Sequence, residues 1–155
     1  MPAAPVVTPV TARTPGVAAL VAALTVELAE GGYSEEETFG YSLDQLEASG
    51  VHLVGASLAG ALVGIGGVEL QGDGFAELKR FYVDPAHRGH GVADSVIEAL
   101  LEHARAAGAT TVRLETGDQQ HAAMRFYARH GFAVVDRFGP YVGSATSVCM
   151  SRALD

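Results

Sequence analysis

The chain has 155 residues, a formal net charge of −8 and 48% hydrophobic residues, enough for a substantial core, and we expect a single domain over residues 1–155. It contains no run of basic residues, so the composition argues against a nucleic-acid partner, and an acidic surface would attract cationic small molecules. A single cysteine, Cys149, excludes an internal disulfide and a cysteine zinc cage and favours a reducing, cytoplasmic address.

The N-terminal part of the chain predicts a lead-in followed by one helix. Residues 1–9 contain three prolines and no Lys or Arg, so we expect a frayed lead-in rather than a secretion signal. The apolar run over residues 16–29 predicts a buried or amphipathic helix, because it is too short to span a membrane and Glu27 interrupts it. Thr14-Pro15 marks the expected start of this helix, and Gly31-Gly32 marks its end.

A segment with three successive glutamates runs from Tyr33 to Tyr41. It is either a charged, solvent-exposed face or a mobile wall over a substrate pocket, and the sequence leaves both interpretations open. Ser42 then predicts the cap of a short helix that ends at Gly50.

The remaining chain alternates strand and helix patterns. Three apolar runs separated by glycine-containing turns predict an antiparallel meander over residues 51–57, 61–70 and 75–83. The patterns that follow predict a helix over 92–108, a strand over 110–116, a helix over 119–131 and strands over 132–138 and 146–152. The expected fold class is α/β of the mixed α+β kind: a largely antiparallel sheet of about six to seven strands, flanked by about four helices, with one strand–helix–strand crossover.

A glycine-rich loop precedes the helix over 92–108. Arg88-Gly89-His90-Gly91 follows a turn at Asp84-Pro85, so several free N–H groups and the positive end of a helix face one point. This arrangement predicts a site for a phosphate-sized anion. The loop matches neither the P-loop pattern nor the dinucleotide fingerprint.

Two motifs resemble the GNAT superfamily of N-acetyltransferases, of the small bacterial single-domain type. The stretch FYVDPAHRGHGVADSVIEALL resembles the acyl-CoA-binding segment, whose signature [QR]-x-x-G-x-[GA] is matched by Arg88, Gly91 and Ala93. The stretch QQHAAMRFYARHGF resembles the family's next segment, N-x-x-A-x-x-x-Y-x-x-x-G-F, with matches at Ala123, Tyr127, Gly131 and Phe132. Gln120 stands where the family more often has Asn, which keeps an amide. The resemblance implies an acyl-CoA-binding core over about residues 75–132.

The resemblance implies acetyl-CoA as cosubstrate, and the residues themselves give no reason to expect a metal. In the family the pyrophosphate binds backbone amides of the loop matched here by Arg88 through Ala93, and a strand matched by Phe81 through Val83 pairs with the pantetheine arm. The implied cofactor-binding residues are Phe81, Tyr82, Val83, Arg88, Gly89, His90, Gly91, Val92, Ala93, Gln120, Ala123 and Tyr127. His87 and His90 could suggest a metal pair, but no third ligand lies at the required spacing.

Acetyl transfer needs a neutral amine, a donor for the thioester oxygen and a proton for the departing thiolate. Tyr127 aligns with the tyrosine that protonates the thiolate in many relatives. The alternative is a core aromatic whose hydroxyl is already hydrogen-bonded.

Glu77 resembles, by its spacing from Val83, the glutamate base of the histone-acetylating branch. Period-two alternation predicts one shared face for Glu77, Lys79, Phe81 and Val83. The alternative is a surface pair of Glu77 with Lys79 or Arg113, with water relayed by Glu115 or a tyrosine replacing Glu77 as base.

The acceptor pocket is expected to include Tyr33, Glu115 and Tyr141, although Tyr141 could also lie in an ordinary turn between strands. The implied function is acetyl transfer from acetyl-CoA to a primary amine of a small molecule. The alternatives are acetylation of a protein N-terminus or lysine, and a non-catalytic acyl-CoA-binding domain. A homodimer through the sheet edge or C-terminal strands, common in the family, also remains open.

Overall fold

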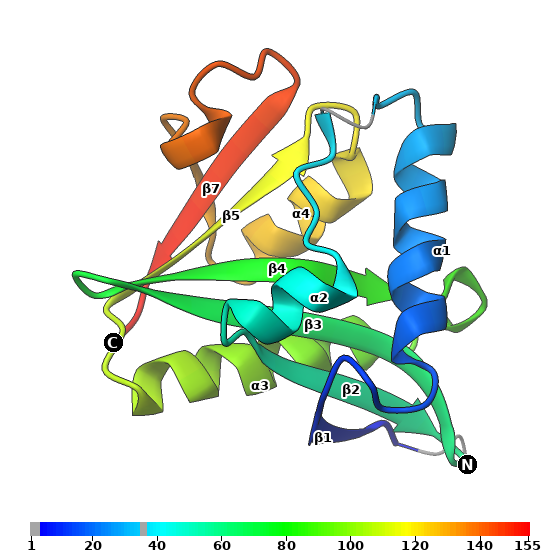
Figure 1. Ribbon diagram of the computed structural model, residues 1–155. Coiled ribbons are helices and arrows are strands. Elements are labelled where there is room, and N and C mark those ends of the chain that lie inside the picture. Colours follow the sequence, from blue (N-terminus) through cyan, green and yellow to red (C-terminus); the bar gives the residue numbers. More distant parts are fainter. Residues whose placement is uncertain (1–3, 35–36) are drawn as a thin grey trace.

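The computed structural model describes residues 4–34 and 37–155, which form one seven-stranded sheet with helices on both faces (Figure 1). The strands are β1 (Val6–Val10), β2 (His52–Leu58), β3 (Ala61–Gly72), β4 (Phe75–Val83), β5 (Thr111–Gly117), β6 (Ala133–Val135) and β7 (Ser147–Ala153). The helices are α1 (Val17–Glu30), α2 (Leu43–Ala48), α3 (Val92–Ala106) and α4 (His121–Arg129), with single 3₁₀ turns η2 (Pro85–His87) and η3 (Gly139–Tyr141).

The strand order is β1-β2-β3-β4-β5-β7-β6, and every neighbouring pair is antiparallel except β4 and β5. The parallel pair needs a crossover, which α3 supplies between β4 and β5. The predicted mixed α/β fold with a largely antiparallel sheet is confirmed.

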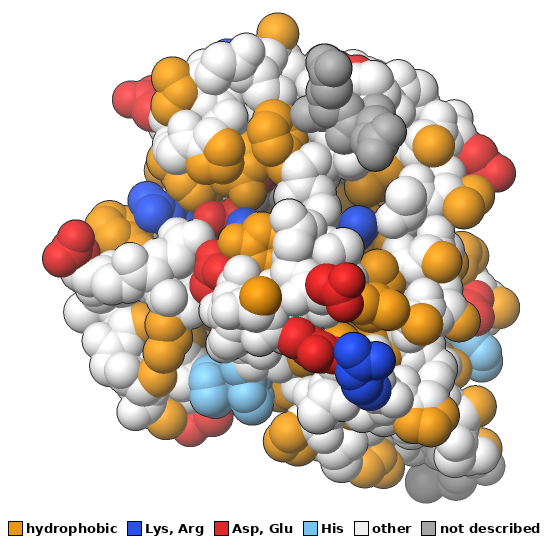
Figure 2. All heavy atoms as spheres, in the orientation of Figure 1, with side chains coloured by type: hydrophobic (Ala, Val, Ile, Leu, Met, Phe, Trp, Pro, Cys, Tyr) orange, Lys and Arg blue, Asp and Glu red, His pale blue; other side chains and the backbone are white. Residues whose placement is uncertain are grey.

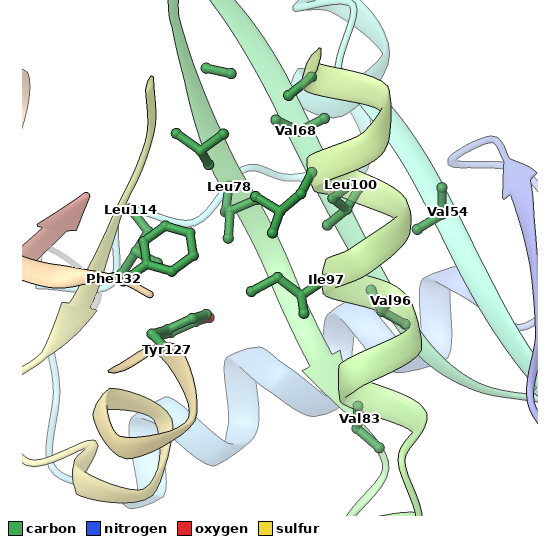
Figure 3. Packing of buried hydrophobic residues seen from close by; sticks show 14 of the residues in the cluster. Val54, Val68, Leu78, Val83, Val96, Ile97, Leu100, Leu114, Tyr127 and Phe132 are labelled. Carbon is green, nitrogen blue, oxygen red and sulfur yellow. The ribbon is translucent and has the colours of Figure 1, made fainter. Parts of the chain in front are cut away.

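Each face of the sheet has its own hydrophobic core. On the face covered by α3 and α4, helix α3 buries residues at four-residue steps against β2, β3 and β4. Tyr127 of α4 lies at the edge of this cluster, beside Phe132 (Figure 3). On the other face, α1 and α2 cover a smaller cluster that includes Ile65 and Tyr82. Each fully buried Val, Leu or Ile contributes about 1.5–3 kcal/mol to folding. Because α3 buries several such residues and α4 buries only Tyr127, α3 contributes most of the packing energy on this face.

Two details at the N-terminus differ from expectation. The predicted frayed lead-in over 1–9 is wrong from Val6 onward, because Val6–Val10 forms β1 and pairs antiparallel with β2. Residues 1–3 lie outside the described part. β1 is an edge strand, where the missing N–H of Pro9 is tolerated.

Helix α1 is capped by Gly16, with φ +94°, and not by Thr14. The Thr14 side chain instead accepts a hydrogen bond from the Thr11 N–H and closes the turn before the helix. The predicted end at Gly31 and the Ser42 cap of α2 are confirmed. No helix within the described residues has both the length and the apolar character to cross a membrane.

A bulge in β4 changes which side chains share a face. The pairing with β3 shifts register between Ile65 and Gly67, and Arg80 has a left-handed φ of +51°. The prediction of one shared face is therefore wrong. Glu77 and Lys79 contact the side chain of Tyr141, whereas the three residues beyond the bulge alternate anew, with Tyr82 in the α1 core and Phe81 and Val83 in the α3 core.

Glycines in β3 allow α3 to approach the sheet closely. A Cβ on Gly66 would lie 2.8 Å from a methyl carbon of Val96 and 2.9 Å from one of Leu100. We expect Gly66→Ala to lower the free energy of unfolding by about 1–3 kcal/mol through overpacking. Gly143→Ala is the matched control, because a Cβ there meets no described atom within 4 Å. Urea unfolding of both variants tests this, and equal midpoints would contradict it.

Candidate active site

The site lies where β4 and β5 separate. These strands pair only through Phe75–Glu77 and Thr111–Arg113, so no described strand pairs with this side of β4 beyond Glu77. A cavity of about 560 Å³ occupies the gap, within the usual range for small-molecule sites. Its walls come from β4, β5, α1, α4, the loop before α3 and the segment from Tyr33 to Tyr41.

One end of the cavity presents free backbone donors. None of the backbone N–H groups of residues 89–94 has a hydrogen-bond acceptor among the described residues, because α3 begins at Val92 and its first internal bond is Ser95 N–H to Gly91 O. Six N–H groups at a helix N-terminus suit an anion such as a pyrophosphate. Gly89 and Gly91, with φ of +82° and +81°, give the loop a shape that other residues adopt only with strain.

Arg88 holds this loop in place. Its Nε donates to Val83 O at 2.9 Å, its Nη2 pairs with Glu27 of α1 at 2.8 Å, and its guanidinium lies over the Tyr82 ring. The side chain is thus committed to the protein, which leaves the backbone amides as the anion donors.

Most of the residues implied to bind acyl-CoA meet in this cavity. Its walls include Phe81, Tyr82, Val83, Arg88, Gly89, Gly91, Ala93, Gln120, Ala123 and Tyr127. His90 does not line it, and the side chain of Val92 is only 1% exposed because it packs in the α3 core. Neither His90 nor Val92 is among the residues that line the cavity.

Tyr127 belongs both to the core and to the cavity wall. Its ring packs edge-on against Phe81, Phe126 and Phe132. Its hydroxyl has no hydrogen-bond partner among the described residues, which differs from the core alternative with a satisfied hydroxyl. Burial, followed by the charge of Glu115, raises the pKa of Tyr127, so the phenol keeps its proton at neutral pH.

Glu77 is 3% exposed and accepts three hydrogen bonds. It accepts from Lys79 Nζ at 2.9 Å, from Tyr141 OH at 2.5 Å and from Gln71 Nε2 at 2.7 Å. The pairing with Lys79 that the sequence allowed is present but buried rather than on the surface. Arg113 reaches Glu77 only through Gln71, to whose Oε1 it donates. The carboxylate is held in place by these donors.

Glu115 of β5 has a different environment. Among the described residues its hydrogen-bond donor is Ser147 Oγ at 2.6 Å, and no cation forms an ion pair with it. Burial raises the pKa of Glu115 to about 7, the nearby charge of Glu77 adds to this, and the Ser147 bond and Lys79 oppose it. A carboxyl with a pKa near neutrality in a cavity wall is suited to accepting a proton.

The acceptor residues expected from sequence also line the cavity. The Tyr33 hydroxyl donates to Asp118 Oδ1 and accepts from Gln119 N–H, which fixes the start of the segment against β5. Phe39 and Tyr41 line the same wall, so this segment is a cavity wall, although residues 35 and 36 lie outside the described part. Tyr141 is 3% exposed and lies in η3.

These features coincide with a known family. The family model described as Acetyltransferase (GNAT) family matches residues 20–132. The chain belongs to this family. An IAA acetyltransferase of Azospirillum brasilense is 32% identical over 123 residues, which cover 79% of this chain and 80% of that protein. The protein is therefore an acyltransferase of the N-acetyltransferase type.

Solved structures agree with this family membership. A Klebsiella pneumoniae structure described as an acyl-CoA N-acyltransferase is 34% identical and has a TM-score of 0.84, covering 97% of this chain and 98% of that one. The PaiA N-acetyltransferase of Thermoplasma acidophilum, solved in complex with coenzyme A, is 19% identical with a TM-score of 0.72, covering 97% and 99%, and shares the fold.

The acetyltransferase has a second cavity of about 330 Å³, whose lining includes Glu77, Lys79 and Tyr141. Both cavities are lined by these three residues and by Phe39 and Tyr41. Figure 2 shows acidic and basic side chains next to one another in this recessed region over β4, bordered by hydrophobic side chains. In the described part of the chain, no three His, Cys, Asp or Glu side chains are grouped to hold a metal ion.

Sequence reasoning missed two cationic residues of the wall, Lys79 and Arg80. Their signal was the pair of adjacent charges inside the apolar run FAELKRFYV. Two neighbouring charges break the alternation of a strand, and a bulge that turns both to one face resolves the conflict.

The pKa of Glu115 makes stability depend on pH. Its carboxyl titrates near 7 in the fold against 4.5 as the ordinary value, so its favourable contribution is complete below pH 4.5 and lost as pH rises through 7. We expect Glu115→Gln to raise Tm at pH 8 by about 2–6 °C relative to its effect at pH 4.5. Glu98→Gln, at an exposed position on α3, is the control. Calorimetry that finds the same Tm difference at both pH values would contradict this environment for Glu115.

Proposed function

We propose that this acetyltransferase transfers an acetyl group from acetyl-CoA to a primary amine of a small molecule by direct attack. The observation that carries the proposal is one continuous cavity that joins unpartnered helix N-terminal amides, an unpaired strand edge, a protonated tyrosine and a near-neutral carboxyl. Acetyl-CoA supplies the activated acyl group, and each of these features suits one part of its reaction.

The pyrophosphate would bind the N–H groups of residues 89–94, where the helix dipole adds favourable charge. The pantetheine amides would pair with the β4 backbone from Phe81 to Val83, as an added strand in the gap before β5. This pairing fixes the thioester near the bulge, where holding two reactants together lowers the entropic part of the barrier.

Glu115 is the proposed base. The amine must lose a proton to attack, and Glu115 titrates near neutrality and lies in the same wall. Glu77, the base implied by the resemblance, already accepts three hydrogen bonds and has the Lys79 ammonium at 2.9 Å. We assign Glu77 to orienting Tyr141 and Lys79 in the wall.

Tyr127 is the proposed acid. The amine nitrogen forms a bond to the acetyl carbon, the carbon–sulfur bond breaks, Glu115 takes the proton from nitrogen and Tyr127 gives one to sulfur. Its free, protonated hydroxyl in the cavity wall supports this role. Exchange with water then restores both groups.

The acceptor side supports a small molecule rather than a protein chain. Phe39, Tyr41 and Tyr141 narrow this side, with the Phe39 and Tyr141 rings packed edge-on at 5.1 Å between centroids. The direct test is release of CoA thiol from acetyl-CoA with a panel of amines and a lysine peptide. Release with small amines and not with the peptide is expected. Release with the peptide alone would favour protein acetylation, and binding of acetyl-CoA without release would favour the non-catalytic alternative.

Tyr127→Phe removes the proposed proton donor while keeping the ring in the core. We expect kcat to fall by about 100-fold, with little change in the KM for acetyl-CoA or in Tm. Steady-state kinetics at saturating amine measure this. A kcat within twofold of the wild type would assign Tyr127 to packing alone.

Glu115→Gln and Glu77→Gln separate the two candidate bases. The kcat/KM of the wild type should rise with pH through about 7, because Glu115 must be ionised. Glu115→Gln should lower kcat/KM at pH 8 by about 100-fold and abolish that rise. Glu77→Gln should keep it. The opposite result, with the rise lost only in Glu77→Gln, would make Glu77 the base.

A further inference from the structure

Arg80 presents an uncompensated positive charge to the cavity. Its Nε donates to Tyr41 O at 2.9 Å and its Nη2 to Thr25 Oγ1 at 3.1 Å, and both acceptors are neutral. No described carboxylate forms an ion pair with it. Burial lowers the pKa of Arg80.

The other cations of the cavity wall are all compensated. Lys79 pairs with Glu77 at 2.9 Å, Arg88 with Glu27 at 2.8 Å and Arg129 with Asp94 at 3.9 Å. Arg80 is only partly buried, and a carboxylate on a ligand in the cavity would compensate its charge. Arg80 is the exception among the described cations of this wall.

The position of Arg80 is built into the fold. Its left-handed φ of +51° at the bulge turns its side chain to the side of Lys79, so both contact Tyr41. Gly40 packs against the guanidinium so closely that a Cβ there would lie 2.4 Å from Cζ. The guanidinium group is thus held in place. Its Nη1 has no acceptor among the described residues, so N–H donors remain for a carboxylate.

Arg80 and Glu115 face the same space. In the parallel register Glu77 pairs with Arg113, so Lys79 and Glu115 come next on that face, and the bulge adds Arg80 to it. Among the described residues, neither Glu115 nor Arg80 forms an ion pair. An acceptor with an amine and a carboxylate matches both, and as a zwitterion it is not repelled by a chain with a net charge of −8.

We infer that the acceptor is an amino carboxylate, with Arg80 binding its carboxylate while its amine nitrogen attacks the thioester beside Glu115. This inference rests on the proposed function. The amine forms the new bond to the acetyl carbon and the carboxylate is unchanged, so the product is an N-acetylated amino carboxylate and free CoA.

The test compares matched acceptors: amino acids, their amides and the corresponding decarboxylated amines, each assayed by thiol release. For the wild type, kcat/KM for an amino acid should exceed that for its amide by about tenfold or more. In Arg80→Gln this ratio should fall to near 1, mainly through a higher KM for the amino acid. Arg80→Lys should keep part of it, because the charge remains without the fork. Arg125→Gln, at an exposed arginine of α4, is the control and should keep the full ratio.

The outcomes separate the two proposals. Amides or decarboxylated amines that match the amino acids in the wild type would overturn the inference and leave the transferase intact. A ratio that survives in folded Arg80→Gln would overturn the role of Arg80. Acetyl-CoA binding without thiol release for any amine would overturn the proposed function itself. The wild-type comparison decides the acceptor class even if the Arg80 variants fail to fold.

Discussion

The separation of β4 from β5 is the constraint on which the rest of the site depends. The strands share three residue pairs and then diverge, and the bulge at Arg80 accompanies this divergence. A sheet without this gap would satisfy the β4 backbone with β5 and leave no cavity. With the gap, one edge of β4 stays unpaired, α3 points its first N–H groups at one end of the opening, and side chains of β5 reach it from the other wall.

The charged groups around this cavity differ in their partners: Glu77 and Lys79 form an ion pair, whereas Glu115 has none among the described residues. Glu77 and Lys79 neutralise one another with help from Tyr141 and Gln71, so they form a stable wall. Glu115 accepts one hydrogen bond, from the Ser147 hydroxyl, and burial raises its pKa to about 7. Neutralising one member of a buried ion pair by proton transfer leaves the other charge uncompensated, which is unfavourable. A carboxyl outside an ion pair can gain or lose a proton at a smaller cost in free energy. Proton transfer is accordingly assigned to Glu115 and the phenol of Tyr127.

The sequence motifs placed the glycine-rich loop at the cavity, but they did not single out Arg80. The loop could be recognised locally, because two glycines directly before a helix are a short sequence pattern. In the structure Gly89 and Gly91 have left-handed φ, and both line the cavity together with Arg88. The role of Arg88 could not be read locally, because its partners Val83 and Glu27 belong to a strand and a helix far apart in the chain. The catalytic role of each residue is a prediction that the variants test.

The sequence by itself predicted the order of strands and helices apart from β1, the crossover between β4 and β5, the glycine-rich loop before α3 and the resemblance to the family. The elements follow from periodicity and glycine spacing, which act over a few residues, whereas the family was implied by the resemblance of two motifs. Only the tertiary structure decided that Val6–Val10 joins the sheet and that the alternation of β4 breaks at Arg80. It also decided that Glu77 accepts three hydrogen bonds, whereas Glu115 and Arg80 form no ion pair with a described residue. Strand pairing and the matching of charges depend on contacts between residues distant in the chain, and the adjacent charges of Lys79 and Arg80 were the one local signal of the bulge.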